Sequence, residues 1–350
     1  MIEHKQFTIA SHLTFDALVA GEPGAPLVLL LHGFAESMHC WRAQIETLGD
    51  AGYRAVAPSQ RGYSPGARPD SREAAHYHID CLMDDAMAIA AASGHGDGRF
   101  HLAGHDWGGS IAWALADRHA ERIASLTVLS RPHPNAFNRA LQMIDGDQAR
   151  RSKHHRAFLE PGAADVVLAN DCRWLRERWA ANGVPASAIE QHLAVLGNKV
   201  AMEAALAWYR ARGAIRGPLG PTRVPTLFIW GDADDTVGRF AAEGTVDFIA
   251  APYRFEVLPG VGHFAADQAP ELVSDCCCDI LRNIRSDGTS EAQKCCRAAK
   301  EHDGMSSKQD SDKRDKDQQE RRDAPRARPS EPNSSPLIND GPELVRDSNC

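Results

Sequence analysis

Residues 104–108, with the sequence GHDWG, have the spacing of a turn that exposes one reactive side chain. They follow a short apolar run at 100–103 and precede a run of helix-forming residues. Glycines on both sides of a central residue let the backbone bend sharply between a strand and a helix, which pushes the central side chain out over the sheet edge. That residue is Asp106. Aspartate is also a common helix N-cap, so the pentapeptide alone leaves a structural role open.

The chemistry that suits Asp106 is nucleophilic attack on a saturated carbon. A carboxylate with an intrinsic pKa of about 4 is already anionic at neutral pH, so it needs no base before it attacks. The product would be an alkyl ester between substrate and enzyme. A base would be needed afterwards, to drive water into that ester.

Two further polar segments follow predicted strands. The run GDADD at 231–235 comes after an apolar stretch at 226–230, and PGVGHF at 259–264 comes after the stretch 253–258. The carboxyl ends of strands in an open α/β sheet gather at one crevice. We therefore expect both segments to lie near Asp106.

His263 is the predicted base, with an acidic partner that fixes its tautomer. Of the three aspartates at 232, 234 and 235 we choose Asp234 as that partner. A histidine in a glycine-rich turn is often an ordinary loop residue. The chain order nucleophile, acid, histidine is nevertheless that of a hydrolytic triad, which favours the catalytic interpretation.

Hydrolysis of an Asp106 ester would create an oxyanion that needs preorganised donors. The backbone amide of Trp107, directly after the nucleophile, is one candidate. The amide of Phe34, in the His32-Gly33-Phe34 turn after an apolar run, is the natural second. The alternative is that this turn only ends a strand.

The surrounding elements alternate between strand and helix. Apolar runs at 26–32, 53–57 and 123–129 predict buried strands, and an apolar face over 75–93 predicts a helix. This order predicts an α/β fold with a mostly parallel, doubly wound sheet. The stretch 131–221 has no clear buried strand, and helical patterns lie near 163–180, 186–196 and 200–212. A further helix is predicted near 238–250. The expected organisation is a core of 1–130 and 222–285, an inserted helical cap at 131–221, and a disordered polar tail at 286–350.

Composition narrows the class of protein. The 350 residues are 43% hydrophobic with a net charge of −8, which argues against a nucleic-acid partner. The N-terminal sequence lacks a secretory pattern, and no apolar run approaches the ~20 residues that span a bilayer. We expect a cytoplasmic enzyme with no cofactor, no metal and no membrane contact, and the oligomeric state stays open.

The chain resembles the α/β-hydrolase superfamily, and within it the branch with an aspartate nucleophile. The run GHDWGG at 104–109 is similar to the elbow of epoxide hydrolases, with haloalkane dehalogenases next, and the resemblance covers about residues 5–285. It implies a cap that bears two acidic hydroxyl donors, usually tyrosines, which hold and protonate the epoxide oxygen. Tyr209 looks like the second donor. The alternative is that Tyr209 is a core residue of an amphipathic helix.

Two positions depart from the family pattern. Ala157 stands where the first cap tyrosine would be, and since some relatives use a histidine slightly earlier, His155 is the candidate donor and His154 a weaker one. Ala35 stands where epoxide hydrolases usually carry proline.

Three functions follow from these residues. The favoured one is the opening of a small, mainly apolar epoxide to a vicinal diol through an Asp106 ester. The second is haloalkane dehalogenation by the same first step, with the indole of Trp107 as a halide donor, although Phe34 stands where dehalogenases often have asparagine. The third is a catalytically silent binding protein with this fold.

Overall fold

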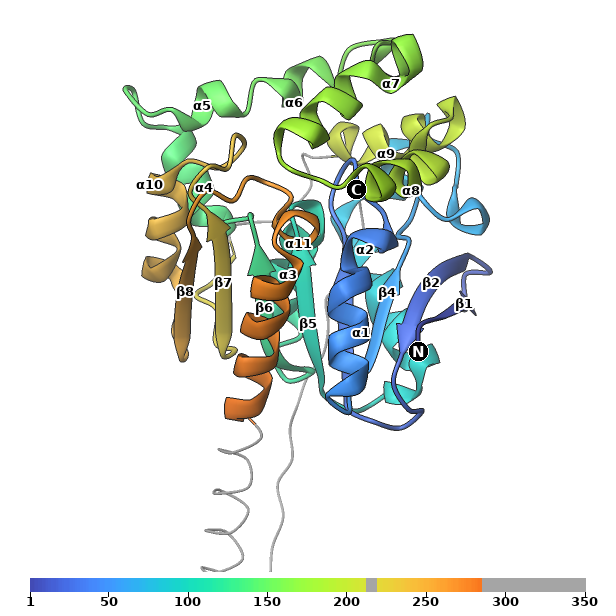
Figure 1. Cartoon of the computed structure of the whole chain (residues 1–350), viewed down its shortest axis with the longest axis vertical. Helices are drawn as coiled ribbons and strands as arrows, with labels where there is room; N and C mark the ends of the chain where they lie inside the picture. Colours follow the sequence, from blue (N-terminus) through green and yellow to red (C-terminus); the bar gives the residue numbers. More distant parts are fainter. Residues whose placement is uncertain (212–218, 285–350) are drawn as a thin grey trace, which may run out of the picture. The chain divides into compact units, whose positions relative to one another are not determined.

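The computed structural model describes residues 1–211 and 219–284, so the predicted tail at 286–350 lies outside the described residues. One eight-stranded sheet runs through the described part (Figure 1). Its strands are β1 (Glu3–Thr8), β2 (Thr14–Ala20), β3 (Leu27–Leu31), β4 (Arg54–Pro58), β5 (Phe100–His105), β6 (Ile123–Leu129), β7 (Thr226–Gly231) and β8 (Tyr253–Leu258).

The strand order is β1-β2-β4-β3-β5-β6-β7-β8. Strand β2 is antiparallel to both of its neighbours, whereas the pairs from β4 to β8 are all parallel. The predicted α/β fold with a mostly parallel sheet is therefore confirmed.

Helices cover both faces of the sheet because the central strands are apolar on both sides. Along β3, Leu29 and Leu31 belong to one apolar cluster, and Val28 and Leu30 belong to another. Helices α2 (Ile79–Ala90) and α3 (Trp107–Arg118) pack in the first cluster. Helix α1 (Arg42–Asp50) and a helix over 270–284 pack in the second.

The described residues between β6 and β7 form six helices. They are α4 (Pro134–Leu141), α5 (Gln148–Arg151), α6 (His154–Ala157), α7 (Ala163–Ala181), α8 (Ala186–Leu196) and α9 (Lys199–Arg210). We call these the helical segment. Helices α5 to α9, drawn in green and yellow, lie beyond the carboxyl ends of the parallel strands (Figure 1), and this places them over the sheet edge where Asp106 stands.

The remaining helices are short. They are η1 (Met38–Trp41), η2 (Pro65–Ala67), η3 (Ala74–Tyr77), η4 (Ala91–His95), α10 (Arg239–Glu243), η5 (Gly244–Phe248) and α11 (Ala265–Gln268). No helix within the described ranges is both long enough and apolar enough to cross a membrane.

Two predicted helices differ in detail. The helix expected near 238–250 is divided into α10 and η5 at Gly244, where glycine and the β-branched residues after it are weak helix formers. Helix α7 is interrupted inside its predicted span, because Ala169 is extended and residues 170–172 have positive φ.

Candidate active site

The turn between β5 and α3 holds Asp106 in a conformation that few non-glycine residues adopt. Its φ is 48° and its ψ is −113°, and such strain concentrates at functional sites. Neighbouring glycines make room for the turn. A Cβ at Gly108 would lie 2.1 Å from the carbonyl oxygen of Leu31, and one at Gly33 would lie 2.5 Å from the Cβ of Asp106. The turn that carries Phe34 therefore packs directly against the elbow.

The two predicted oxyanion donors contact the Asp106 carboxylate itself. The Phe34 N–H donates to Asp106 Oδ1 at 3.1 Å, and the Trp107 amide also hydrogen-bonds the carboxylate. Burial alone would raise the pKa of Asp106. The nearby His263, His105 and these donors outweigh burial and lower the pKa to about 2. Asp106 is thus an anion at any physiological pH.

His263 and Asp234 form the predicted acid and base pair. The ring Nδ1 of His263 lies 3.0 Å from Asp234 Oδ2 and 3.1 Å from Oδ1. Asp234 Oδ1 also accepts hydrogen bonds from the backbone amides of Thr236 and Val237, at 2.7 and 3.0 Å. The carboxylate is therefore fixed from two sides. Its neighbours Asp232 and Asp235 are exposed, so the structure brings only the chosen aspartate to His263.

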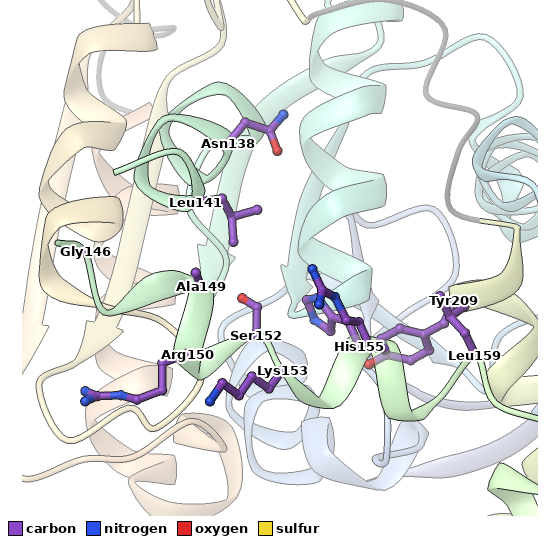
Figure 2. Close-up of a pocket in the computed structure, with 11 residues that line it drawn as sticks. Asn138, Leu141, Gly146, Ala149, Arg150, Ser152, Lys153, His155, Leu159 and Tyr209 are labelled. Carbon is purple, nitrogen blue, oxygen red and sulfur yellow. The ribbon is translucent and has the colours of Figure 1, made fainter. Parts of the chain in front are cut away.

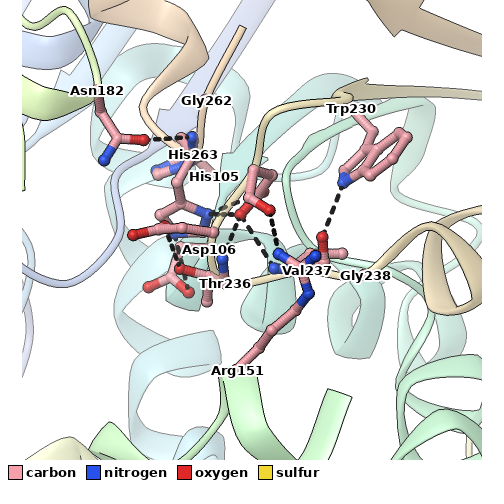
Figure 3. Close-up of polar contacts among 12 residues, drawn as sticks. His105, Asp106, Arg151, Asn182, Trp230, Thr236, Val237, Gly238, Gly262 and His263 are labelled. Carbon is pink, nitrogen blue, oxygen red and sulfur yellow. Dashed lines mark hydrogen bonds and ion pairs between the residues drawn. The ribbon is translucent and has the colours of Figure 1, made fainter. Parts of the chain in front are cut away.

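The other ring nitrogen of His263 faces the nucleophile. Nε2 lies 3.8 Å from Asp106 Oδ2, too far for a direct hydrogen bond. Because Nδ1 donates to a carboxylate, Nε2 of the neutral ring is left as a proton acceptor. The backbone of His263 is held by Asn182, whose side-chain oxygen accepts from the His263 N–H at 2.9 Å (Figure 3). This arrangement leaves the base oriented toward a water beside Asp106.

A second buried ion pair adjoins the elbow, and the sequence did not indicate it. His105 Nδ1 lies 2.7 Å from Glu36 Oε2, with both side chains fully buried. The other ring nitrogen donates to the carbonyl oxygen of His263 at 2.8 Å. Burial lowers the pKa of His105, but Glu36 more than compensates and raises it to about 9, while the pKa of Glu36 is lowered. The pair ties the elbow to the His263 loop.

This pair predicts a pH dependence of stability. A histidine with a raised pKa stabilises the fold fully below its unfolded value of about 6.5, and the contribution is lost as pH rises through about 9. A shift from 6.5 to about 9 corresponds to roughly 3 kcal/mol. We expect the Tm to fall between pH 6.5 and 9.5, and to fall less in Glu36→Gln, which lacks the carboxylate. Parallel Tm curves for the two proteins would contradict the assignment.

One group in the described part of the chain brings three possible metal ligands together. Ligand atoms of Glu36, His192 and Asp267 lie within 4.8 Å of one another. Both ring nitrogens of His192 already have a partner, because Nε2 contacts Asp267 Oδ2 at 2.9 Å and Nδ1 contacts the Ser37 hydroxyl at 3.1 Å. We therefore interpret the group as a polar contact between α8 and the sheet domain.

A small inner cavity of about 20 Å³ lies at the nucleophile. Its walls include Asp106 and His263 from the sheet edge, and Trp174, Arg178 and Tyr209 from the helical segment. Phe34, Phe158 and Phe264 add apolar surface. Tyr209 is buried, and its ring meets Phe34 and Trp107 at nearly right angles, at 5.3 and 5.2 Å between ring centres. The predicted cap tyrosine is thus brought to the same cavity as the nucleophile.

The two adjacent histidines take different positions from those expected. His154, the weaker candidate, lines the inner cavity, whereas His155 lines a larger outer cavity beside Tyr209, with 5.6 Å between the two rings. Burial lowers the pKa of His154 to about 4, so its ring is neutral. Its Nδ1 lies 3.0 Å from the Arg151 carbonyl oxygen, which only accepts, so Nε2 carries no proton to donate.

Ala35 has a backbone conformation that proline cannot adopt. Its φ is +60°, whereas the proline ring fixes φ near −65°. The replacement of the family's usual proline by Ala35 therefore agrees with the backbone conformation at this position. The Phe34 amide still reaches Asp106 at 3.1 Å, so the donor expected from this turn is in place.

Comparison with known proteins agrees with this architecture. The family described as alpha/beta hydrolase fold matches residues 26–270. Epoxide hydrolase A of Mycobacterium tuberculosis is 32% identical over 308 residues, with 76% of this chain and 93% of that protein covered. Epoxide hydrolase 3 of Xenopus tropicalis is 28% identical over 289 residues, covering 78% of this chain and 76% of the relative.

Solved structures give the same result. A structure described as one of the novel epoxide hydrolases from metagenomes of hot environments superposes with a TM-score of 0.71 at 29% identity, covering 80% of this chain and 99% of the other. The chain therefore belongs to the α/β-hydrolase superfamily. Within that superfamily it is an epoxide hydrolase-like hydrolase.

Proposed function

We propose that this protein hydrolyses epoxides to vicinal diols through a covalent ester on Asp106. The observation that carries the proposal is the assembly around one carboxylate. Backbone donors contact Asp106 on one side, with Phe34 N 3.1 Å from Oδ1, and His263 Nε2 lies 3.8 Å from Oδ2 on the other. Relatives named epoxide hydrolases support the choice of substrate class.

In the first step, Asp106 Oδ2 attacks one epoxide carbon from the inner cavity. A carbon–oxygen bond of the ring breaks as the ester bond forms, and the epoxide oxygen, still bound to the neighbouring carbon, becomes an alkoxide that needs a proton. A phenol with a pKa near 10 can supply it. Tyr209 is the phenol in the wall of this cavity, so we assign it that role.

In the second step, His263 Nε2 takes a proton from water, and the resulting hydroxide attacks the ester carbon of Asp106. Asp234 stabilises the imidazolium that forms. The negative charge that develops on the ester oxygen is stabilised by the amides of Phe34 and Trp107, which already contact this carboxylate. When the ester bond breaks, the leaving diol oxygen and the Tyr209 phenolate each take up a proton, from the His263 imidazolium and from the new Asp106 carboxyl group. The diol is then released, and the Asp106 carboxylate, the neutral His263 ring and the Tyr209 phenol are regenerated. No step draws on a cofactor.

We assign residues 131–221, which include the helical segment, the role of a cap over the active site. It supplies Trp174, Arg178 and Tyr209 to the inner cavity, while the sheet edge supplies the triad. The aromatic walls favour a small, mainly apolar substrate. We assign His155 as the second proton donor rather than His154, because the available nitrogen of the neutral His154 ring is an acceptor. His155 lines the outer cavity, so this role requires it to act from beside Tyr209, whose ring centre lies 5.6 Å from its own (Figure 2).

Haloalkane dehalogenation, the second function considered, is less well supported. The indole of Trp107 packs at nearly right angles against Trp208 and Tyr209, with centres at 5.8 and 5.2 Å, and the inner cavity is lined by other side chains. A leaving halide would thus lack the indole donor assigned to it. The assembled Asp106, His263 and Asp234 also argue against a silent binding protein.

Tyr209→Phe tests the epoxide assignment. Loss of the acid that protonates the alkoxide is expected to lower epoxide turnover by about 100-fold or more, whereas release of bromide from an alkyl bromide needs no such acid. Styrene oxide and a bromoalkane serve as substrates, with diol and bromide as readouts. Tyr253→Phe is the matched control because Tyr253 lies on β8, away from the cavity.

The adjacent histidines provide an internal comparison for the second donor. We expect His155→Gln to slow epoxide opening more than His154→Gln does. A larger loss of epoxide turnover in His154→Gln than in His155→Gln would reassign the second donor to His154.

For Tyr209→Phe, equal losses of bromide release and diol release would contradict the acid role of Tyr209.

A further inference from the structure

Helix α7 ends beside the loop that carries the proposed base, and the local sequence fixes where it ends. Gly183 has a φ of +72°, and its N–H donates to the Ala180 carbonyl oxygen at 3.0 Å. The Val184 N–H donates to the Trp179 carbonyl oxygen at 3.0 Å. These two bonds form the Schellman motif, which ends a helix at a glycine. Asn182, the residue before that glycine, is therefore held in a defined place at the end of the helix.

The buried Asn182 side chain joins this helix end to the base loop, residues 259–264. Its Oδ1 accepts from the His263 N–H at 2.9 Å (Figure 3), and its Nδ2 donates to the Arg178 carbonyl oxygen at 3.0 Å. Because a carbonyl oxygen only accepts, the second bond directs Oδ1, and not the NH₂ group, at the loop. A Cβ at Gly262 would lie 2.2 Å from Oδ1, so only glycine allows this close approach.

The backbone of His263 is held at both ends. Its N–H donates to Asn182, and its carbonyl oxygen accepts from His105 Nε2 at 2.8 Å. The ring is held as well, since Nδ1 lies 3.0 Å from Asp234 Oδ2. These contacts fix the direction of Nε2, which lies 3.8 Å from Asp106 Oδ2. Of the three partners of His263, Asn182 alone belongs to the helical segment.

We infer that Asn182 is a positioning residue for hydrolysis of the Asp106 ester, so that the helical segment aligns the base. The inference rests on the proposed ester mechanism and concerns its second step. Attack on the epoxide uses the Asp106 carboxylate, which the amides of Phe34 and Trp107 hold. Activation of water uses His263 Nε2, and a displacement of about 1 Å can cost about 100-fold in rate. Loss of the Asn182 bond should therefore slow the second step and spare the first.

The test measures the two steps separately in two variants of Asn182. Asn182→Leu has a similar size and no acceptor, whereas Asn182→Asp keeps an oxygen at the position of Oδ1. With styrene oxide and rapid quench, Asn182→Leu should form the ester within about threefold of the unmodified rate and hydrolyse it about 10- to 100-fold more slowly. Asn182→Asp should hydrolyse it within about fivefold of the unmodified rate. Equal losses in the two variants would overturn the inference, because the acceptor would then be irrelevant.

Asn198 provides a matched control within the helical segment. It is the exposed N-cap of α9, and its Oδ1 accepts from the Ala201 N–H at 3.0 Å. Asn198→Leu removes a hydrogen bond that stabilises the helical segment but that does not reach the base loop. Both rates should stay within about threefold of those of the unmodified protein.

Two results of this comparison would overturn the inference. Ester hydrolysis that slows as much in Asn198→Leu as in Asn182→Leu would mean that general loosening of the helical segment explains the effect. Ester formation that falls as much as ester hydrolysis in Asn182→Leu would mean that Asn182 supports the fold and not the base.

Hydrogen exchange tests the bond without any substrate. The His263 N–H is buried and donates to Asn182, so its exchange should be at least about tenfold faster in Asn182→Leu and close to normal in Asn182→Asp. Unchanged exchange in Asn182→Leu overturns the inference. Failure of the unmodified protein to form diol contradicts the proposed function, whereas diol formation with an unslowed second step in Asn182→Leu contradicts the positioning role alone.

Discussion

Replacing Asp106 with asparagine is expected to lower kcat/KM for epoxide hydrolysis by at least about 10⁴-fold. The neutral amide is a poor nucleophile, and among the described residues that line the inner cavity only Asp106 carries a carboxylate. The measurement is diol formation from styrene oxide with purified protein, followed to long times and high enzyme concentration. A surviving rate within about tenfold of the unmodified protein would remove Asp106 from the mechanism.

This variant is expected to fold. Asp106 has a positive φ of 48°, and asparagine is among the few residues that tolerate such a conformation. Its side-chain oxygen can still accept from the Phe34 amide, which now donates to Oδ1. Circular dichroism and a Tm close to that of the unmodified protein would show that the lost activity reflects chemistry and not unfolding.

Asp234→Asn is expected to slow hydrolysis of the ester by about 10³- to 10⁴-fold, with ester formation affected far less. The amide cannot stabilise the imidazolium, and its NH₂ group favours the wrong tautomer of His263, whose Nδ1 now lies 3.0 Å from a carboxylate oxygen. Rapid-quench experiments should show a burst equal to the enzyme concentration, followed by a slow steady state. Loss of the burst together with turnover would place Asp234 in the first step instead.

Asp232 offers a matched control for this change. It lies two residues away, is exposed, and accepts a hydrogen bond from the Gly260 amide at 2.7 Å rather than from His263. Asp232→Asn should therefore leave the two rates within a few-fold of the unmodified protein. A burst in Asp232→Asn as well would mean that the effect arises from the loop and not from the charge on Asp234.

Asp106, Asp234 and His263 could be placed from sequence because each follows a recognisable strand: β5 and β7 are buried throughout, and β8 alternates between apolar and charged residues. Strands such as β3 are buried on both faces, so their positions are readable as continuous apolar runs. The carboxyl ends of parallel strands lie at the same edge of a sheet, so Asp106, Asp234 and His263 could be expected to lie close together there.

Residues on helices beyond the sheet could not be placed this way. His154 and His155 differ by one position, and only the packing of α6 decides that His154 reaches the inner cavity while His155 faces the outer one. Arg178 and Trp174 reach the inner cavity from α7, a helix whose interruption at 169–172 no propensity argument indicated.

The Glu36 and His105 pair was missed for a related reason. The two residues are 69 positions apart, and only the close approach of the Gly33 turn to the elbow brings them within 2.7 Å. A signal was available in hindsight, because a histidine stands directly beside the predicted nucleophile and a glutamate stands two residues after Phe34, and a glutamate is almost never fully buried unless it is paired.

The central claim is that Asp106 forms a covalent ester with the substrate, and intact mass measurement of His263→Gln tests it most directly. Without the base that activates water, the ester should accumulate after addition of styrene oxide. The account predicts that the protein gains the mass of one epoxide, and that peptide mapping places the gain on Asp106. An unchanged mass under conditions where the unmodified protein forms diol, or an adduct on another residue, would contradict the account.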